Sequence, residues 1–282
     1  MKNIILIFTA LSLLLSISGC GTFGSDKPTE QAGATAETEE RDSVIQLYQS
    51  AQAELKKENY IKAAGMFDDV ERQFPYSKWA TRANLMAAYA HYEALEYDSA
   101  IVTLNRFIEL HPGHKDIAYA HYLKALSFYE QIIDIGRDQK TTRNAETALQ
   151  EVVRRFPDSE YARDAKLKLD FVHDHLAGKE SAVGRFYLKR HQYHAAIGRF
   201  NRVIRDFGTT THVPEALHRL VEAYYALGLN EQARQVAAVL GHNFPGSDWY
   251  QASFALLKGE EIPDLDNNQG STWQQLKRSV GL

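Results

Sequence analysis

Apolar positions along this chain recur with the spacing of an amphipathic helix, and the same helical pattern occurs five times. In each copy an alanine is followed by apolar residues four and seven positions later, and by an aromatic or histidine residue eleven positions later. Spacings of four and seven place side chains on one face of a helix. The alanine and the closing residue of the copies are Ala63 and Phe74, Ala100 and His111, Ala145 and Phe156, Ala196 and Phe207, and Ala233 and Phe244.

Each copy also carries a signal that ends the helix. Proline follows the closing residue in four copies, and Gly208 follows it in the remaining one. Proline cannot continue a helix, and it restricts the residue before it. Ser77, Ser159 and Ser247 stand two residues after such a proline, where they suit the N-cap of the next helix. The pattern therefore predicts helices paired across tight turns.

The period of the pattern indicates a family of helical repeats. Successive closing residues lie 37 to 51 residues apart, somewhat more than the length of a tetratricopeptide (TPR) repeat, about 34 residues. Inserts explain the excess: a Gly-bearing charged loop over 134–142, and an unbroken run over 159–189 that predicts one long helix or two nearly in line. Since no alternating strand pattern occurs, we expect an all-α fold, a TPR solenoid of five helix pairs over residues 42–257.

The N-terminus predicts export and lipidation. Lys2 and a mostly apolar run over 4–15 are followed by Ile17-Ser18-Gly19-Cys20. The run is too short to span a bilayer and is typical of a secretory signal. The last four residues resemble the bacterial lipobox, so we expect a signal peptide over 1–19 and an N-terminal diacylglycerol and acyl (palmitate) group on Cys20. The alternative is an ordinary signal peptide with an incidental cysteine.

The segments that flank the repeats differ from them in composition. Residues 20–41 hold almost no apolar side chains and predict a flexible tether. The tail, residues 258–282, is polar and acidic before it ends in Trp273, Leu276 and Val280. Their spacing predicts a short helix, which either docks on the last repeat or on a partner, or only caps the chain.

The sequence contains no motif that points to catalysis. Its net charge of −4 without a basic stripe argues against nucleic-acid binding. The close histidine pairs lack a third ligand or a glutamate at metalloprotease spacing, and no phosphate-binding loop or serine nucleophile motif occurs. We therefore expect no metal and no cofactor other than the lipid. The chain is interpreted as a scaffold, not an enzyme.

Several stretches resemble one family. Phe74-Pro-Tyr-Ser77, Gly136-Arg-Asp-Gln139, Arg154-Arg-Phe-Pro-Asp-Ser-Glu-Tyr161 and the run Glu180–Arg190 are similar to the BamD (ComL/YfiO) family of outer-membrane assembly lipoproteins, in an alphaproteobacterial form. The resemblance implies a lipoprotein on the periplasmic face of the cell outer membrane, within the β-barrel assembly (BAM) complex. Its implied partners are BamA, other BAM lipoproteins and unfolded outer membrane proteins, whose insertion it helps.

The resemblance also implies a contact with BamA through Arg199, three residues after Ala196. Arg199 lies off the apolar stripe of its helix, so we expect it to be exposed. The alternative role is that of an ordinary solvated surface arginine.

A groove for an extended substrate segment is implied in the early repeats. Aromatic side chains beside an arginine would suit a peptide with alternate large side chains and a C-terminal carboxylate. Leu85 and Tyr92 are equally well explained as packing residues. Counting from the central alanines predicts the groove residues Tyr48, Gln52, Arg82, Leu85, Tyr89 and Tyr92.

A second function remains open for such a fold. A periplasmic TPR scaffold could instead coordinate peptidoglycan or cell-division factors. Proteins of that kind commonly carry a coiled coil before the repeats, and residues 21–41 show no heptads. The assembly function is therefore favoured.

Overall fold

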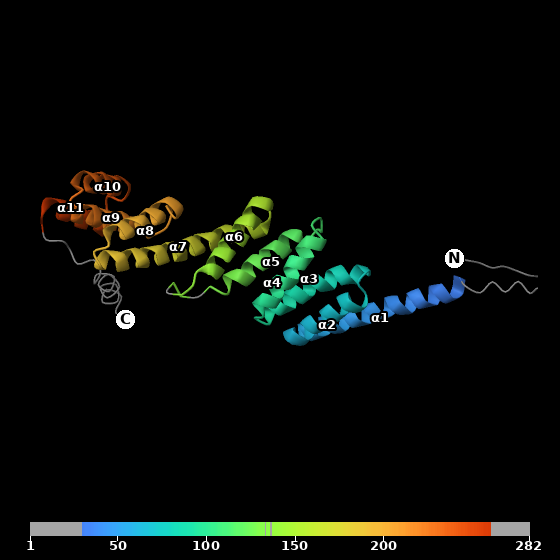
Figure 1. Cartoon of the computed structure of the whole chain (residues 1–282). Coiled ribbons are helices and arrows are strands. Elements are labelled where there is room, and N and C mark those ends of the chain that lie inside the picture. Colours follow the sequence, from blue (N-terminus) through green and yellow to red (C-terminus); the bar gives the residue numbers. More distant parts are fainter. Residues whose placement is uncertain (1–29, 133, 136, 261–282) are drawn as a thin grey trace, which may run out of the picture. The chain divides into compact units, whose positions relative to one another are not determined.

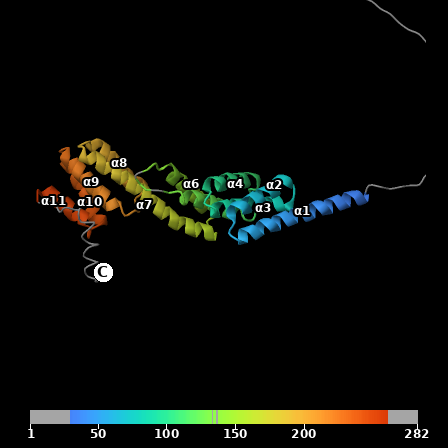
Figure 2. The same ribbon diagram turned by 90° about the horizontal axis from the view of Figure 1, so that it is seen from below.

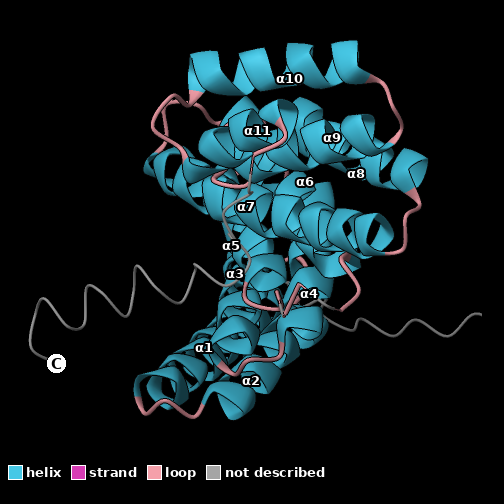
Figure 3. Ribbon diagram, turned by 90° about the vertical axis from the view of Figure 1, so that its left-hand side faces the viewer, coloured by secondary structure: helices cyan, strands magenta, loops and turns pink. Residues whose placement is uncertain are grey.

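The computed structural model describes residues 30–132, 134–135 and 137–260, with side chains from residue 41 onward. The described residues form helices joined by turns and loops, without a strand among them (Figure 3). Cys20, the signal peptide and the tail helix expected at residues 273–280 lie outside them. The helices are α1 (Glu30–Lys56), α2 (Tyr60–Gln73), α3 (Lys78–Glu93), α4 (Tyr97–Leu110), α5 (Ile117–Tyr129), α6 (Lys140–Arg155), α7 (Glu160–Lys189), α8 (Tyr193–Asp206), α9 (Val213–Ala226), α10 (Asn230–Asn243) and α11 (Asp248–Lys258).

The five predicted helix pairs are confirmed, from α1 with α2 to α9 with α10, and α11 follows them. The chain divides at Ser43 and Val44 into two compact units. In the first unit α1 already begins at Glu30, so the tether predicted up to residue 41 is helical from there on. The segment is rich in alanine and glutamate, which favour a helix even without apolar side chains to pack.

The repeated apolar pattern forms the core of the second unit. The five central alanines have no exposed surface, and Phe67, Leu104, Leu149 and Phe200, four positions after their alanines, are equally buried. A small residue at the centre of a helix lets the neighbouring helix approach closely, and the bulky residues then fill the space on either side. Successive helices from α2 to α11 therefore lie side by side (Figures 1 and 2).

The first helices of the pairs also contact one another. Helix α3 touches α5, and the contacts continue through α7 and α9 to α11. Among the described helices, the even-numbered ones do not touch one another in this way. The odd-numbered helices thus form one continuous layer, and side chains on their free side lie on a common surface that crosses several repeats.

Predicted boundaries agree with the capping geometry. The hydroxyls of Ser77, Ser159 and Ser247 accept hydrogen bonds from backbone N–H groups in the first turns of α3, α7 and α11, at 3.1, 3.2 and 3.2 Å. These bonds satisfy donors that a helix start leaves without a partner. The loop of the third repeat ends earlier than expected, because α6 begins at Lys140 instead of after Thr142.

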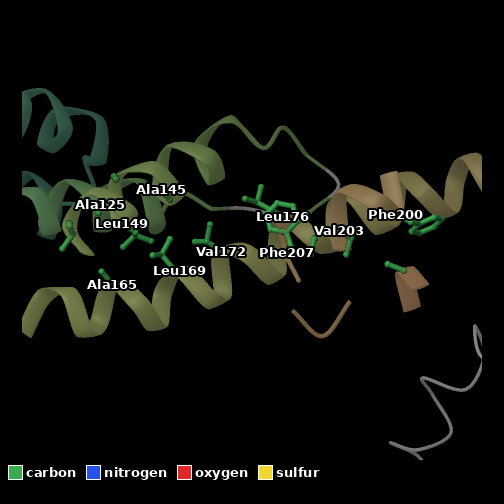
Figure 4. Packing of buried hydrophobic residues seen from close by; sticks show 14 of the residues in the cluster. Ala125, Ala145, Leu149, Ala165, Leu169, Val172, Leu176, Phe200, Val203 and Phe207 are labelled. Carbon is green, nitrogen blue, oxygen red and sulfur yellow. The ribbon is translucent and has the colours of Figure 1, made fainter. Parts of the chain in front are cut away.

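Helix α7 is the longest insertion in the repeat pattern. It runs unbroken for 30 residues, which decides between the two predicted arrangements in favour of a single helix. Its first half packs through Leu169 and Val172 against α6, and its second half packs against Phe200 of α8 (Figure 4). No described helix has the combination of length and apolar character that spanning a bilayer requires.

Candidate functional site

A positively charged hollow of about 600 Å³ lies where the start of α6 meets α7 and α8. Its lining includes five basic side chains and two acidic ones, Asp138 and Glu180. We call it the cationic pocket. Its basic residues are Arg137, Lys140, Arg143, Lys179 and Arg199.

Glu180 is the charge around which this pocket is built. Its side chain is only 6% exposed. The guanidinium of Arg199 donates a hydrogen bond of 3.0 Å to one carboxylate oxygen of Glu180, and that of Arg202 donates one of 3.0 Å to the other oxygen. A guanidinium nitrogen of Arg143 lies 4.0 Å from the oxygen that Arg202 binds. A buried carboxylate needs such partners, because leaving it without them costs several kcal/mol, on the order of 3–5. Glu180 therefore fixes the positions of the arginines.

Arg199, which we expected to be exposed, is half-buried. Its side chain is 34% exposed, since the guanidinium turns back over α8 to reach Glu180 on α7. The hydrogen bond to that carboxylate also raises the pKa of Arg199 further above its ordinary value. Arg199 still lines the pocket, so it presents a fixed positive charge instead of a mobile one.

Gln139 brings an unusual polar group to the same pocket. It is 7% exposed, and its side-chain N–H group donates to the backbone carbonyl of Arg137 at 3.0 Å. Its side-chain oxygen is buried and accepts no hydrogen bond from the described residues. An unpaired buried acceptor costs about 1–3 kcal/mol. The pocket thus combines excess positive charge with one buried acceptor that has no partner among the described residues.

A second surface lies on the layer of odd-numbered helices. Tyr89 and Tyr92 of α3, Tyr119 and Tyr122 of α5, and Tyr161 of α7 are all half-buried. The ring centroid of Tyr161 lies 5.7 Å from that of Tyr119 and 5.2 Å from that of Tyr122. The Tyr122 hydroxyl donates a hydrogen bond to Asp164. We call these five residues the tyrosine strip.

Burial makes the hydroxyls of the tyrosine strip harder to ionise than that of an ordinary tyrosine. Burial raises the pKa of Tyr92 to about 12, with a further contribution from the carboxylate of Glu130. Burial also raises the pKa of Tyr119 and of Tyr122 above their ordinary values. The strip presents a row of neutral aromatic rings, which suits a peptide with aromatic side chains.

The structure separates the six residues predicted for the groove. Tyr48 is 3% exposed and packs between Phe67 and Trp79, at ring distances of 5.4 and 4.8 Å. Leu85 is 8% exposed. Neither side chain is accessible to a substrate, because both belong to the cores of their repeats.

The remaining four predicted residues are accessible to different degrees. Arg82 is exposed, with its guanidinium 6.0 Å from the centre of the Trp79 ring. Gln52 is half-buried, and Tyr89 and Tyr92 form the first part of the tyrosine strip.

Sequence reasoning missed Tyr119, Tyr122 and Tyr161, although a signal for the first two was present. They repeat the three-residue spacing of Tyr89 and Tyr92 thirty positions later. The basic residues at the start of α6 were missed as site residues for another reason. They lie in an insert, and only the fold brings residues 137–139 next to Lys179 and Glu180. Both groups belong to, or adjoin, stretches that carried the family resemblance.

A layer of paired helices with an aromatic surface and a charged pocket defines a binding scaffold of the TPR class. Residues 40–240 match the family model YfiO, described as an outer membrane lipoprotein. The chain belongs to this family, whose curated relatives are the outer membrane protein assembly factors BamD. These relatives are assembly factors, which agrees with the prediction that the chain is not an enzyme.

The similarity to individual relatives extends over most of the chain. BamD of Caulobacter vibrioides is 49% identical over 249 residues, which cover 88% of this chain and 80% of the relative. BamD of Rickettsia prowazekii is 46% identical over 215 residues, 76% of this chain and 86% of the relative. Among solved structures, the TPR domain of P58(IPK) is similar with a TM-score of 0.43 and 15% identity, over 83% of this chain and 61% of that one.

Proposed function

We propose that this chain is a lipid-anchored, periplasm-facing subunit of the BAM complex that binds BamA and guides unfolded outer membrane proteins. The observation that carries the proposal is the cationic pocket. Two of the stretches on which the family resemblance rests meet there around Arg199. Scaffolds act by presenting such preformed surfaces.

The BamA contact is assigned to the cationic pocket. Basic side chains outnumber acidic ones in its lining, so it favours an acidic side chain of the partner. Arg199 is already held by Glu180, and less conformational entropy is lost when a fixed guanidinium binds a carboxylate.

Variants at the exposed rim test this contact without touching the buried ion pair. Arg137 and Lys140 are exposed, whereas Glu180 is held by Arg199 and Arg202. The double variant Arg137→Glu/Lys140→Glu should lower the affinity for the periplasmic part of BamA at least tenfold, because each reversed charge would repel an acidic partner. Lys166→Glu, an exposed position outside the pocket, is the matched control. Equal affinity of all three proteins, measured at equal thermal stability, would refute the assignment.

The substrate contact is assigned to the tyrosine strip. Its rings cross three odd-numbered helices and offer a surface longer than the groove expected from the first two repeats. Hydroxyl-radical footprinting with an unfolded outer membrane protein should protect Tyr89, Tyr122 and Tyr161. Tyr76, which is fully exposed, should stay reactive, and the buried Tyr48 should be unreactive throughout. Unchanged labelling of the strip would exclude it as the substrate site.

Membrane attachment is assigned to lipid on Cys20, which lies outside the described residues. Burial of acyl chains contributes about 0.8 kcal/mol per CH₂, and stable anchoring takes two or more chains. A Cys20→Ser variant exported with its signal peptide should move from the membrane to the soluble periplasmic fraction and lose incorporation of labelled palmitate. Retention at the membrane without label would place the anchor elsewhere.

A further inference from the structure

An apolar notch lies at the turns of the first two repeats, away from the cationic pocket. It is an open hollow of about 700 Å³ between the start of α2 and the end of α3. Ile61 on one wall and Leu95 on the other are 67% and 71% exposed. Past Leu95 the surface falls into a smaller hollow of about 180 Å³ at the start of α4. Two aliphatic side chains, Ile61 and Leu95, are thus exposed to solvent in the notch, and Leu95 also lines the smaller hollow.

Leu95 occupies a position where an aliphatic residue is unfavourable. Its φ angle is +61°, in the left-handed region. The matching turn between α9 and α10 carries Gly228 at +73°, and the other two matching turns carry polar residues, Glu58 and His191. A leucine here costs conformational energy of about 1 kcal/mol and gains no burial within the chain. Such a departure from local preference is expected where a residue serves binding.

The rim of the notch is acidic. Glu58 and Glu93 line it together with Tyr60. Burial is the largest cause that raises the pKa of Tyr60, and the negative charges of these two carboxylates raise it further. The two neighbouring lysines, Lys57 and Lys62, are both bound by Glu54, at 2.9 and 3.3 Å. Neither Glu58 nor Glu93 has an ion pair among the described residues, although the Tyr89 hydroxyl donates a hydrogen bond to Glu93. The lining of the notch therefore carries more negative than positive charge.

We propose that this notch, formed by Ile61 and Leu95 between Glu58 and Glu93, binds an extended segment of a partner protein that carries an aliphatic side chain next to lysine or arginine. The aliphatic side chain lies between Ile61 and Leu95, and the flanking cations pair with the two carboxylates. The charge of the rim decides the class of partner, because an acidic segment or an anionic lipid surface would be repelled. This inference is independent of the contact proposed for BamA.

A pair of synthetic peptides tests the chemistry directly. One is a twelve-residue peptide of alternating leucine and lysine, and the other has glutamate in place of lysine. Fluorescence anisotropy with the complete chain should show binding of the lysine peptide only. Leu95→Asn should weaken it at least tenfold through the lost apolar contact, and Glu58→Lys by a similar factor. Asparagine tolerates the left-handed conformation, so Leu95→Asn preserves the turn.

Leu110→Asn serves as the matched control, since Leu110 is 61% exposed at the end of α4 and lines neither hollow. It should bind the lysine peptide as the unchanged chain does. Equal binding by Leu95→Asn, or equal binding of the glutamate peptide, overturns the proposal.

A photo-crosslinking residue at position 95, in protein from native envelopes, then identifies the partner segment by mass spectrometry. A captured segment with lysine or arginine beside an aliphatic residue agrees with the proposal. An acidic segment, a lipid or a second copy of this chain contradicts it.

Discussion

Reversing the charge of Arg199 should destabilise the fold as well as any partner contact. Arg199→Glu removes the 3.0 Å hydrogen bond to Glu180 and brings a second carboxylate to a side chain that is only 6% exposed. Loss of a hydrogen bond to a charged group costs about 1.5–3 kcal/mol. Arg202 continues to hold the other oxygen of Glu180, so the cost stays near the lower end.

Repulsion between the two carboxylates adds to that cost. At about 4 Å and an effective dielectric constant of about 20 it would reach about 4 kcal/mol. The new side chain can turn toward water, because the position is 34% exposed, and only a part of the repulsion remains. Together the two contributions lower the free energy of unfolding by about 3 kcal/mol. For a chain of this size that corresponds to a fall in melting temperature of about 6–12 °C.

Urea unfolding followed by far-UV circular dichroism measures this loss, and a double-mutant cycle assigns it to the pair. In a Glu180→Gln background the repulsion is absent, so Arg199→Glu should cost about 1 kcal/mol or less, with an interaction energy of about 2 kcal/mol. A loss below about 0.5 kcal/mol, or the same loss in both backgrounds, would refute the argument. A partner-binding assay on Arg199→Glu alone therefore cannot separate contact from folding.

Three further outcomes follow from local geometry. Gly184→Ala should lower the free energy of unfolding by about 1–3 kcal/mol, since a Cβ would lie 2.7 Å from the Phe200 ring. Gly198→Ala has free space around the new Cβ and should raise the free energy of unfolding by about 0.5–1 kcal/mol. Urea unfolding compares the two variants. Ser159→Ala should lower the free energy of unfolding by about 1 kcal/mol through the lost N-cap of α7, which urea unfolding also measures. His91 lies between the carboxylates of Asp68 on α2 and Glu96 at the start of α4, and the hydrogen bond to Asp68 raises the pKa of His91. The stability that protonated His91 contributes should be complete below about pH 6.5 and be lost as the pH rises through its folded-state pKa. Melting curves recorded across this pH range should show the loss, and His91→Gln should abolish it.

The parts of the fold that could be predicted are those that repeat. The spacing of the alanines and bulky residues fixes which face of each second helix is buried, and all five alanines are. Phe-Pro-x-Ser places the helix starts correctly because the proline and the serine act locally. The start of α1 was missed because its first turns lack an apolar stripe and rest on helix propensity instead. Tyr48 was misjudged because its burial depends on Trp79 in the next repeat, which no pattern within α1 reveals.

The cationic pocket lies where the repeat is broken, and for that reason a periodic pattern could not predict it. The cationic pocket is made by the insert before α6 and by the extension of α7, the two segments that lengthen the third and fourth units. Arg199 lies in a regular position, but its partner Glu180 stands nineteen residues earlier, on the extended helix. An insert is not constrained by the stacking of the repeats, so it is free to carry charge that stacking would not tolerate. The insert before α6 and the extension of α7 are therefore the positions at which the partner of the cationic pocket should be sought.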